Sequence, residues 1–156
     1  MKKAIILACS HLLAVFLGFA AGIYLLPILT APPPPSTTAL SGAAEDALFT
    51  GQFRRDLADS DALHWGEGTV HVGRKIIALE GAVSPGPAYK LYLAPEFLET
   101  EADFLSQRDD MALVGDVKTF ENFIVPVPSS VDPTAYSAVI VWCEAFDQFI
   151  TAAHYR

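Results

Sequence analysis

The first thirty residues contain the feature that most limits what this chain can fold into. No charged side chain occurs in residues 4–29, a run of 26 mostly apolar residues. A helix of about 20 apolar residues is enough to cross the hydrocarbon core of a bilayer. Two lysines precede the run, and the next basic residue is Arg54. Because basic residues favour the cytoplasmic side, we expect residues 1–30 to be a single-pass anchor in an inner or plasma membrane, with the N-terminus cytoplasmic and the remaining chain periplasmic or extracellular.

A cleaved signal peptide is the alternative interpretation of this run. Signal peptides have apolar cores of about 7–15 residues and end at small residues. The run is longer than that, and cleavage after Ala31 would leave Pro32 at the new N-terminus. An uncleaved signal-anchor that contacts the membrane through residues 4–29 is therefore the preferred interpretation.

A proline-rich linker is expected at residues 31–48. It contains four consecutive prolines, Pro32 to Pro35, which favour the stiff, extended polyproline II conformation. Such a segment would hold a domain at a distance from the bilayer. One or two helical turns are expected at residues 43–49.

Short segments of alternating apolar residues, separated by glycine and proline, fill residues 49–156. Strands are predicted at Thr69–Val72, Lys75–Leu79, Tyr89–Leu93, Met111–Val114 and Phe120–Val127, with a hairpin turn at Gly73–Arg74. Pro126 and Pro128 would restrict the fifth strand to a sheet edge or mark its end, and Thr100 can cap a short helix. In this register His71 falls on the wetter face of its strand, so we expect it on the surface. The pattern predicts one all-β domain, a β-sandwich or a barrel, behind the transmembrane helix.

The most strand-like run of the chain is Val139–Phe146. Its residues alternate between two faces, one with Val139, Val141 and Cys143 and the other with Ile140 and Trp142. Both faces are apolar, which is typical of an interior strand that is covered on both sides. The second cysteine, Cys9, lies in the apolar N-terminal run, so we do not expect a disulfide between the two.

Cys143 has three interpretations: a packing residue of the core, a redox thiol, or a ligand of a metal or haem iron. A free cysteine is unusual in an oxidising compartment. His64 would make a sensible partner, because sulfur and imidazole together suit a transition metal. His64 and Trp65 precede two closely spaced glycines, which allow close approach of a ligand or of another strand, or mark a bulge. With Trp142 they are the candidate ligand-binding residues.

Charge and motif content exclude several classes of protein. The segment after residue 31 carries all eighteen acidic residues and eight of the ten basic ones, a net charge of −10. That charge argues against nucleic-acid binding. No glycine-rich phosphate loop, nucleophile elbow, zinc-protease motif or haem-attachment motif occurs. The three aspartates between residues 56 and 61 lack the pattern of a calcium loop. No enzyme class and no dedicated metal site is therefore indicated.

Four segments together resemble the DM-thirteen (DM13) domain, a family also described as an electron-transfer domain and found with DOMON modules. They are Gly51–Phe53, His64–Val70, Gly86–Leu93 and Val139–Phe146. The resemblance implies a β-sandwich-like domain with a cysteine in its last strands, at Cys143, and a redox role either as a bare thiol or through a prosthetic group such as haem. The chain departs from the family pattern at Glu67, where serine is common, and at Ala88, where aspartate is common.

Two functional hypotheses follow. The first is a membrane-anchored extracytoplasmic domain with a redox or small-ligand-binding role centred on Cys143 and an unidentified protein or redox partner. The second is a non-catalytic interaction or structural module in which Cys143 is buried core. The residues leave open whether any cofactor, haem included, is bound.

Overall fold

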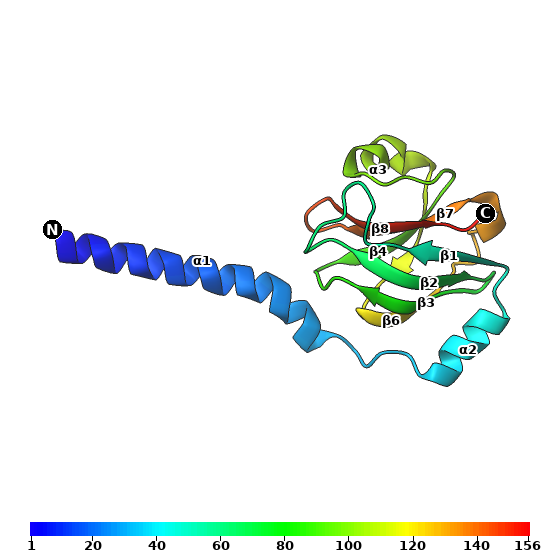
Figure 1. Ribbon diagram of the computed structural model, residues 1–156, viewed down its shortest axis with the longest axis horizontal. Coiled ribbons are helices and arrows are strands. Elements are labelled where there is room, and N and C mark those ends of the chain that lie inside the picture. The colour runs from blue at the N-terminus through cyan, green and yellow to red at the C-terminus, as the bar shows by residue number, and fades with distance from the viewer.

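Two antiparallel sheets pack face to face in the computed structural model, which describes residues 1–156 (Figure 1). The first sheet has the order β1 (Phe49–Phe53), β2 (Gly66–Val72), β3 (Ile76–Val83), β6 (Glu121–Pro126). The second has the order β5 (Ala112–Asp116), β4 (Tyr89–Ala94), β7 (Ala138–Cys143), β8 (Gln148–His154). The predicted all-β domain is thus a β-sandwich of two separate sheets. The β2–β3 hairpin and the edge position of β6 are confirmed, but the turn residues are Arg74 and Lys75 rather than Gly73 and Arg74.

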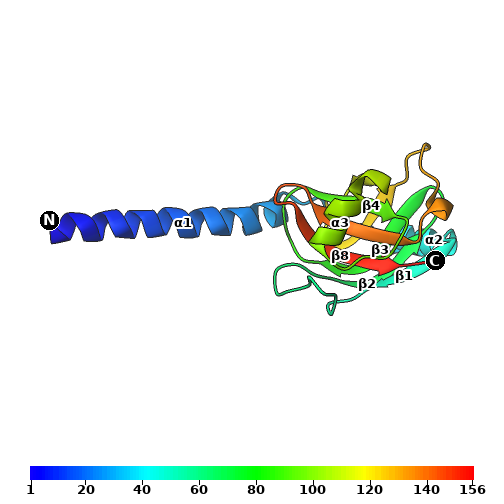
Figure 2. The same ribbon diagram turned by 90° about the horizontal axis from the view of Figure 1, so that it is seen from above.

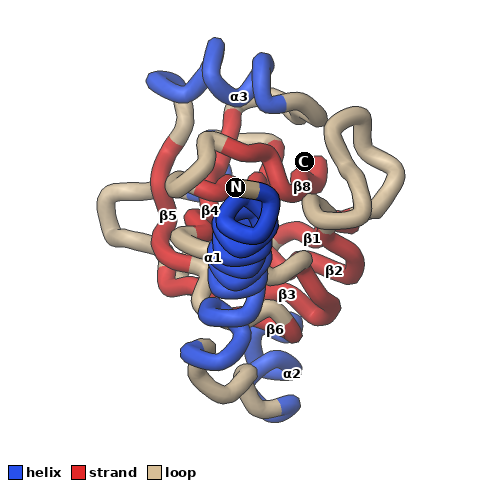
Figure 3. Tube along the Cα trace, turned by 90° about the vertical axis from the view of Figure 1, so that its left-hand side faces the viewer, coloured by secondary structure: helices blue, strands red, loops and turns tan.

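A short helix covers the outer face of each sheet, as the view along α1 shows (Figure 3). Helix α2 (Thr37–Glu45) packs on the first sheet, and α3 (Glu101–Gln107) packs on the second. The hydroxyl of Thr100 accepts a hydrogen bond from the backbone N–H of Asp103 at 3.1 Å, so the predicted N-cap of α3 is confirmed. Two single-turn 3₁₀ helices, η1 (Arg108–Asp110) and η2 (Pro133–Ala135), complete the elements.

Strand β7 lies inside the second sheet, between β4 and β8, and all six of its residues are buried. Its two faces contribute to different apolar clusters, as the alternation predicts. Val139, Val141 and Cys143 belong to the core between the sheets, and Ile140 and Trp142 to the cluster beneath α3. Because both faces of β7 are buried, its sequence is a continuous run of apolar residues.

Helix α1 (Lys2–Thr30) extends away from one end of the sandwich (Figures 1 and 2). It has 29 residues, and none of its side chains is buried. It is long and apolar enough to cross a membrane. Between α1 and the first sheet, the linker forms α2 six residues earlier than the helical turns expected at residues 43–49. Ser36 caps α2 by accepting a hydrogen bond from the N–H of Ala39.

The prediction that His71 lies on the surface is wrong. Its side chain is only 11% exposed, and neither ring nitrogen has a hydrogen-bond partner. The reason is that α2 packs on this face of the first sheet: Ala78, which is paired with His71, contacts the cluster of Leu40 and Ala43. The alternation correctly identified the outer face, but it carried no information about the helix that covers it.

Candidate functional site

A cavity of about 550 Å³ lies at the end of the sandwich from which α1 departs. Cys143 lines it from the end of β7, Tyr89 from the start of β4, and His64 from the loop before β2. We call it the Cys143 cavity. Cys143 and His64, the pair suggested by their chemistry, therefore border one space although they are distant in the sequence.

The Cys143 thiol is protonated and nearly inaccessible. The residue is 3% exposed, and Sγ donates a hydrogen bond to the carbonyl oxygen of Pro87 at 3.1 Å. Burial raises the pKa of Cys143 by more than the backbone N–H groups of Phe146 and Ala145 lower it. Because the thiolate is the nucleophilic form, this sulfur is a poor nucleophile at neutral pH.

We expect Cys143 in the folded chain to react with a maleimide at least about 100-fold more slowly than in the denatured chain at pH 7.5, since a raised pKa and burial both reduce attack. The measurement uses the Cys9→Ser variant, in which Cys143 is the single thiol. The exposed reference is Ser106→Cys on α3, in a chain that also carries Cys9→Ser and Cys143→Ala. Equal rates for Cys143 and the reference would contradict the buried thiol.

His64 is held by Asp61 in a defined tautomer. Asp61 Oδ1 accepts hydrogen bonds from the backbone N–H groups of Leu63 at 2.7 Å and His64 at 2.8 Å, and Oδ2 lies 3.0 Å from His64 Nδ1. The hydrogen bond from His64 is the largest cause that lowers the pKa of Asp61. A carboxylate only accepts hydrogen bonds, so Nδ1 carries a proton, and in the neutral form of the ring Nε2 keeps a free lone pair.

The other two candidate residues do not line the Cys143 cavity. Trp65 lies beneath the guanidinium of Arg55, whose Cζ is 3.3 Å from the ring centre, and Arg55 also pairs with Glu67 at 2.6 Å. Trp142 follows the alternation of β7 to the opposite face of its sheet, where it stacks on Phe104 at 3.9 Å.

The glycines after Trp65 serve close contacts between strands. Gly68 pairs with Gly81 of β3, and both have positive φ, +117° and +159°. A Cβ on Gly66 would lie 2.5 Å from the side chain of Thr151 on β8. Of the two possibilities left open by the sequence, close approach of another strand explains these glycines, and β2 pairs with β3 without a bulge here.

Ala88 occupies a left-handed turn beside the cavity, with φ +53°. Its carbonyl oxygen accepts a hydrogen bond from the N–H of Glu144, which fixes the turn against the end of β7. Aspartate and asparagine tolerate this backbone region better than alanine. An aspartate, which the family resemblance leads us to expect at this position, would therefore suit the turn.

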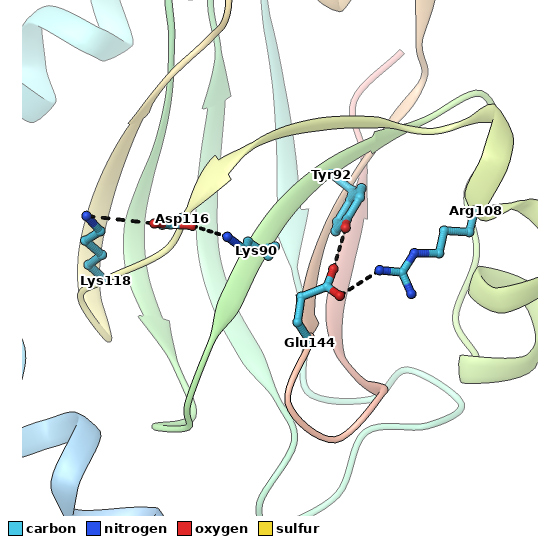
Figure 4. A network of polar contacts seen from close by, with 6 residues as sticks. All are labelled: Lys90, Tyr92, Arg108, Asp116, Lys118 and Glu144. Atoms are coloured by element: carbon cyan, nitrogen blue, oxygen red, sulfur yellow. Dashed lines mark hydrogen bonds and ion pairs between the residues drawn. The ribbon is translucent and has the colours of Figure 1, made fainter.

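A polar network that the sequence did not reveal lies next to Cys143 in the chain (Figure 4). Glu144 accepts hydrogen bonds from the Tyr92 hydroxyl and from Arg108 Nη2, the latter at 2.6 Å. Burial alone would raise the pKa of Glu144, but the hydrogen bonds from Tyr92 and Arg108 outweigh it and hold the pKa below its ordinary value. A second pair, Lys90 and Asp116 at 2.5 Å, lies on the same sheet.

The Glu144 network makes stability depend on pH. The pKa of Glu144 is lower in the folded than in the unfolded chain, so its contribution is fully present above the unfolded value of about 4.3 and is lost as pH falls through the folded value. Because Arg108 is 37% exposed, we expect Glu144→Gln to cost only about 1 kcal/mol at pH 7, and less below pH 4. Urea titrations at both pH values measure the difference, with Asp109→Asn as an exposed control. An equal cost at both pH values would contradict the shift.

Asp61, Tyr89 and Gln148 belong to the site although the sequence did not predict them there. A signal existed for Asp61, because an aspartate three residues before a histidine can accept its backbone and ring N–H groups. No such local signal exists for Tyr89 and Gln148, which reach the cavity through the pairing of β4, β7 and β8.

Haem, one of the options implied by the resemblance, does not fit the Cys143 cavity. No lysine or arginine lines it, so the two haem propionates would have no cationic partner. The sulfur that would bind iron donates a hydrogen bond to the carbonyl oxygen of Pro87, which ligation would break. No group of three or more His, Cys, Asp or Glu side chains is placed to hold a metal ion.

Comparison with known proteins gives one match. A protein-family model described as Electron transfer DM13 matches residues 52–155. Neither the curated proteins nor the solved structures contain a match to the chain.

Proposed function

The chain belongs to the DM13 electron-transfer family, and we propose that it is a membrane-anchored extracytoplasmic domain whose redox or ligand-binding site is the Cys143 cavity. The observation that carries this proposal is the cavity itself. It brings Cys143, the cysteine of the family resemblance, together with His64 and with the apolar helix α1.

In this proposal α1 is an uncleaved anchor, residues 31–48 are the linker, and residues 49–156 are the functional domain. The exposed apolar surface of α1 supports the anchor, since a helix with no buried side chain and no charge over residues 4–29 is unfavourable in water. The lysines at its start favour a cytoplasmic N-terminus. The domain would then lie on the periplasmic or extracellular side.

Electron transfer at this site does not require Cys143 to act as a thiolate. Its sulfur and the imidazole of His64 form part of the wall of a cavity large enough for a small organic molecule. We propose that the domain holds a redox-active ligand there and exchanges electrons with a separate redox partner. Cys143 and His64 contact and orient that ligand.

A second function has a specific observation in its favour. Cys143 belongs to the apolar core between the sheets and is only 3% exposed. A cysteine in this position can serve packing alone, and the domain would then be an interaction module.

The two functions differ in what the purified chain contains. We would purify the full chain from its native membrane and record absorption spectra in the oxidised and reduced states, beside Cys143→Ala and His64→Gln. The redox proposal expects a difference spectrum that both variants weaken. A Soret band would instead show that haem is bound, against the lack of cationic partners for its propionates in the Cys143 cavity. If the chain shows no difference spectrum and Cys143 stays reduced at every ambient potential, the redox proposal is wrong and the interaction module is the remaining function.

A further inference from the structure

We propose that the Cys143 cavity binds the ring of a membrane-soluble quinone, which enters from the bilayer along α1. This inference rests on the proposed function, because it takes α1 as a membrane anchor and the cavity as the redox site. It names the ligand class, which the family membership leaves open.

The position of the cavity relative to the bilayer is the first argument. About 20 residues are enough to cross the hydrocarbon core, so residues 4–23 of α1 suffice for it, and residues 24–29 follow in the headgroup layer. Tyr24 then falls at the outer headgroup level, where aromatic side chains concentrate. Ala20, Ile23 and Tyr24 are the residues of α1 that line the cavity. The cavity therefore lies at the boundary between lipid and water.

The second argument is the apolar entrance. Leu63 and Phe146 are the most exposed large apolar residues of the domain, at 58% and 57%, and both line the Cys143 cavity. Each is on a loop at the end of the sandwich beside α1. Apolar side chains in this position contact the acyl-chain boundary of a membrane rather than water, so a ligand dissolved in the bilayer reaches the cavity without crossing water.

The lack of charged side chains in the cavity lining narrows the class of ligand. No aspartate, glutamate, lysine or arginine lines the cavity. An anionic phosphate headgroup would be desolvated there without a partner, which disfavours a phospholipid. The ligand is then uncharged and soluble in the membrane, and the proposed redox function calls for it to be redox-active. Quinones combine these three properties.

The cavity is lined by neutral polar side chains that can pair with the oxygens of a quinone. In the neutral form of His64 the lone pair of Nε2 can accept a hydrogen bond from the hydroxyl of the reduced ring, because Asp61 holds the proton on Nδ1. The side-chain amide of Gln148 can donate to a carbonyl of the oxidised ring. A volume of about 550 Å³ lies in the range of small-ligand sites, about 300–1,000 Å³. The quinone binds reversibly and forms no covalent bond to the sulfur of Cys143.

The test measures binding of two probes, decylubiquinone and phylloquinone, to the full chain in lipid nanodiscs, with empty nanodiscs as the blank. Leu63→Asp and Phe146→Asp each place a charge at the entrance, and both positions are exposed enough to tolerate it. We expect each to weaken binding of at least one probe tenfold or more. Leu105→Asp on α3 is the matched control, since Leu105 is 47% exposed and is not among the residues of the Cys143 cavity; it should bind as the unaltered chain does.

His64→Leu gives an independent readout. It removes the acceptor at Nε2, so it should weaken binding of the reduced probe more than binding of the oxidised probe. Unchanged binding in both aspartate variants, or a phospholipid in the cavity that neither probe displaces, would overturn the inference. If neither probe binds but the native chain shows a difference spectrum that depends on Cys143, the quinone is wrong and the proposed redox function stands. If neither probe binds and the native chain shows no such difference spectrum, the quinone inference and the proposed redox function both fail.

Discussion

Replacing Gly68 by alanine is expected to lower the free energy of unfolding by about 3 kcal/mol or more. Gly68 has φ +117°, a region that residues with a Cβ rarely adopt. An added Cβ would lie 2.3 Å from the carbonyl oxygen of Glu80 and 2.6 Å from Cα of Gly81. Both atoms are backbone, so relief requires β2 and β3 to separate. Since domains are stable by only about 5–15 kcal/mol, the change removes a large part of the total.

Urea titration of the full chain in detergent, followed by tryptophan fluorescence, measures this cost. Gly42→Ala is the matched control, because nothing lies within 4 Å of its added Cβ and alanine is the better helix former in α2. Gly42→Ala should raise stability by up to about 1 kcal/mol. A cost below 1 kcal/mol for Gly68→Ala would show that the two strands are not held at this distance.

The parts of the fold that the sequence predicted are those set by local patterns. Alternation placed Cys143 and Trp142 on opposite faces of one interior strand, and the structure agrees. Pro126 correctly restricted β6 to an edge, because proline cannot donate a hydrogen bond to a further strand. Thr100 marked the start of α3 through its hydroxyl.

The parts that could not be predicted depend on contacts between distant segments. The burial of His71 follows from α2, whose own position is fixed by packing against the first sheet rather than by a strong helix signal. Arg108 reaches Glu144 only because η1 and the end of β7 meet in space. The Cys143 cavity likewise exists only where three loops and α1 converge. The alternation of β7 does, by itself, place Trp142 on the face opposite Cys143, as the two separate clusters show.

Trp142→Ala is expected to cost about 3–5 kcal/mol, the range for removing a large aromatic side chain from a core. The indole is fully buried and stacks on Phe104 with an interplanar angle of 8°. Phe104 in turn meets the ring of Tyr92 edge-on at 5.2 Å. Removing the indole therefore opens a void under α3. It also leaves Phe104, which attaches this helix to the second sheet, without its stacking partner.

Trp142→Phe separates the aromatic stack from the size of the indole. Phenylalanine keeps a ring against Phe104, and it also removes an Nε1–H that is buried without a hydrogen-bond partner. We therefore expect Trp142→Phe to cost less than half as much as Trp142→Ala in urea titrations followed by circular dichroism. Because Trp142 and Cys143 lie on opposite faces of β7, the maleimide reactivity of Cys143 should be the same in Trp142→Phe as in the unaltered chain. Faster reaction of Cys143 in this variant would mean that the cluster beneath α3 also maintains the Cys143 cavity, and that the two faces of β7 do not act independently.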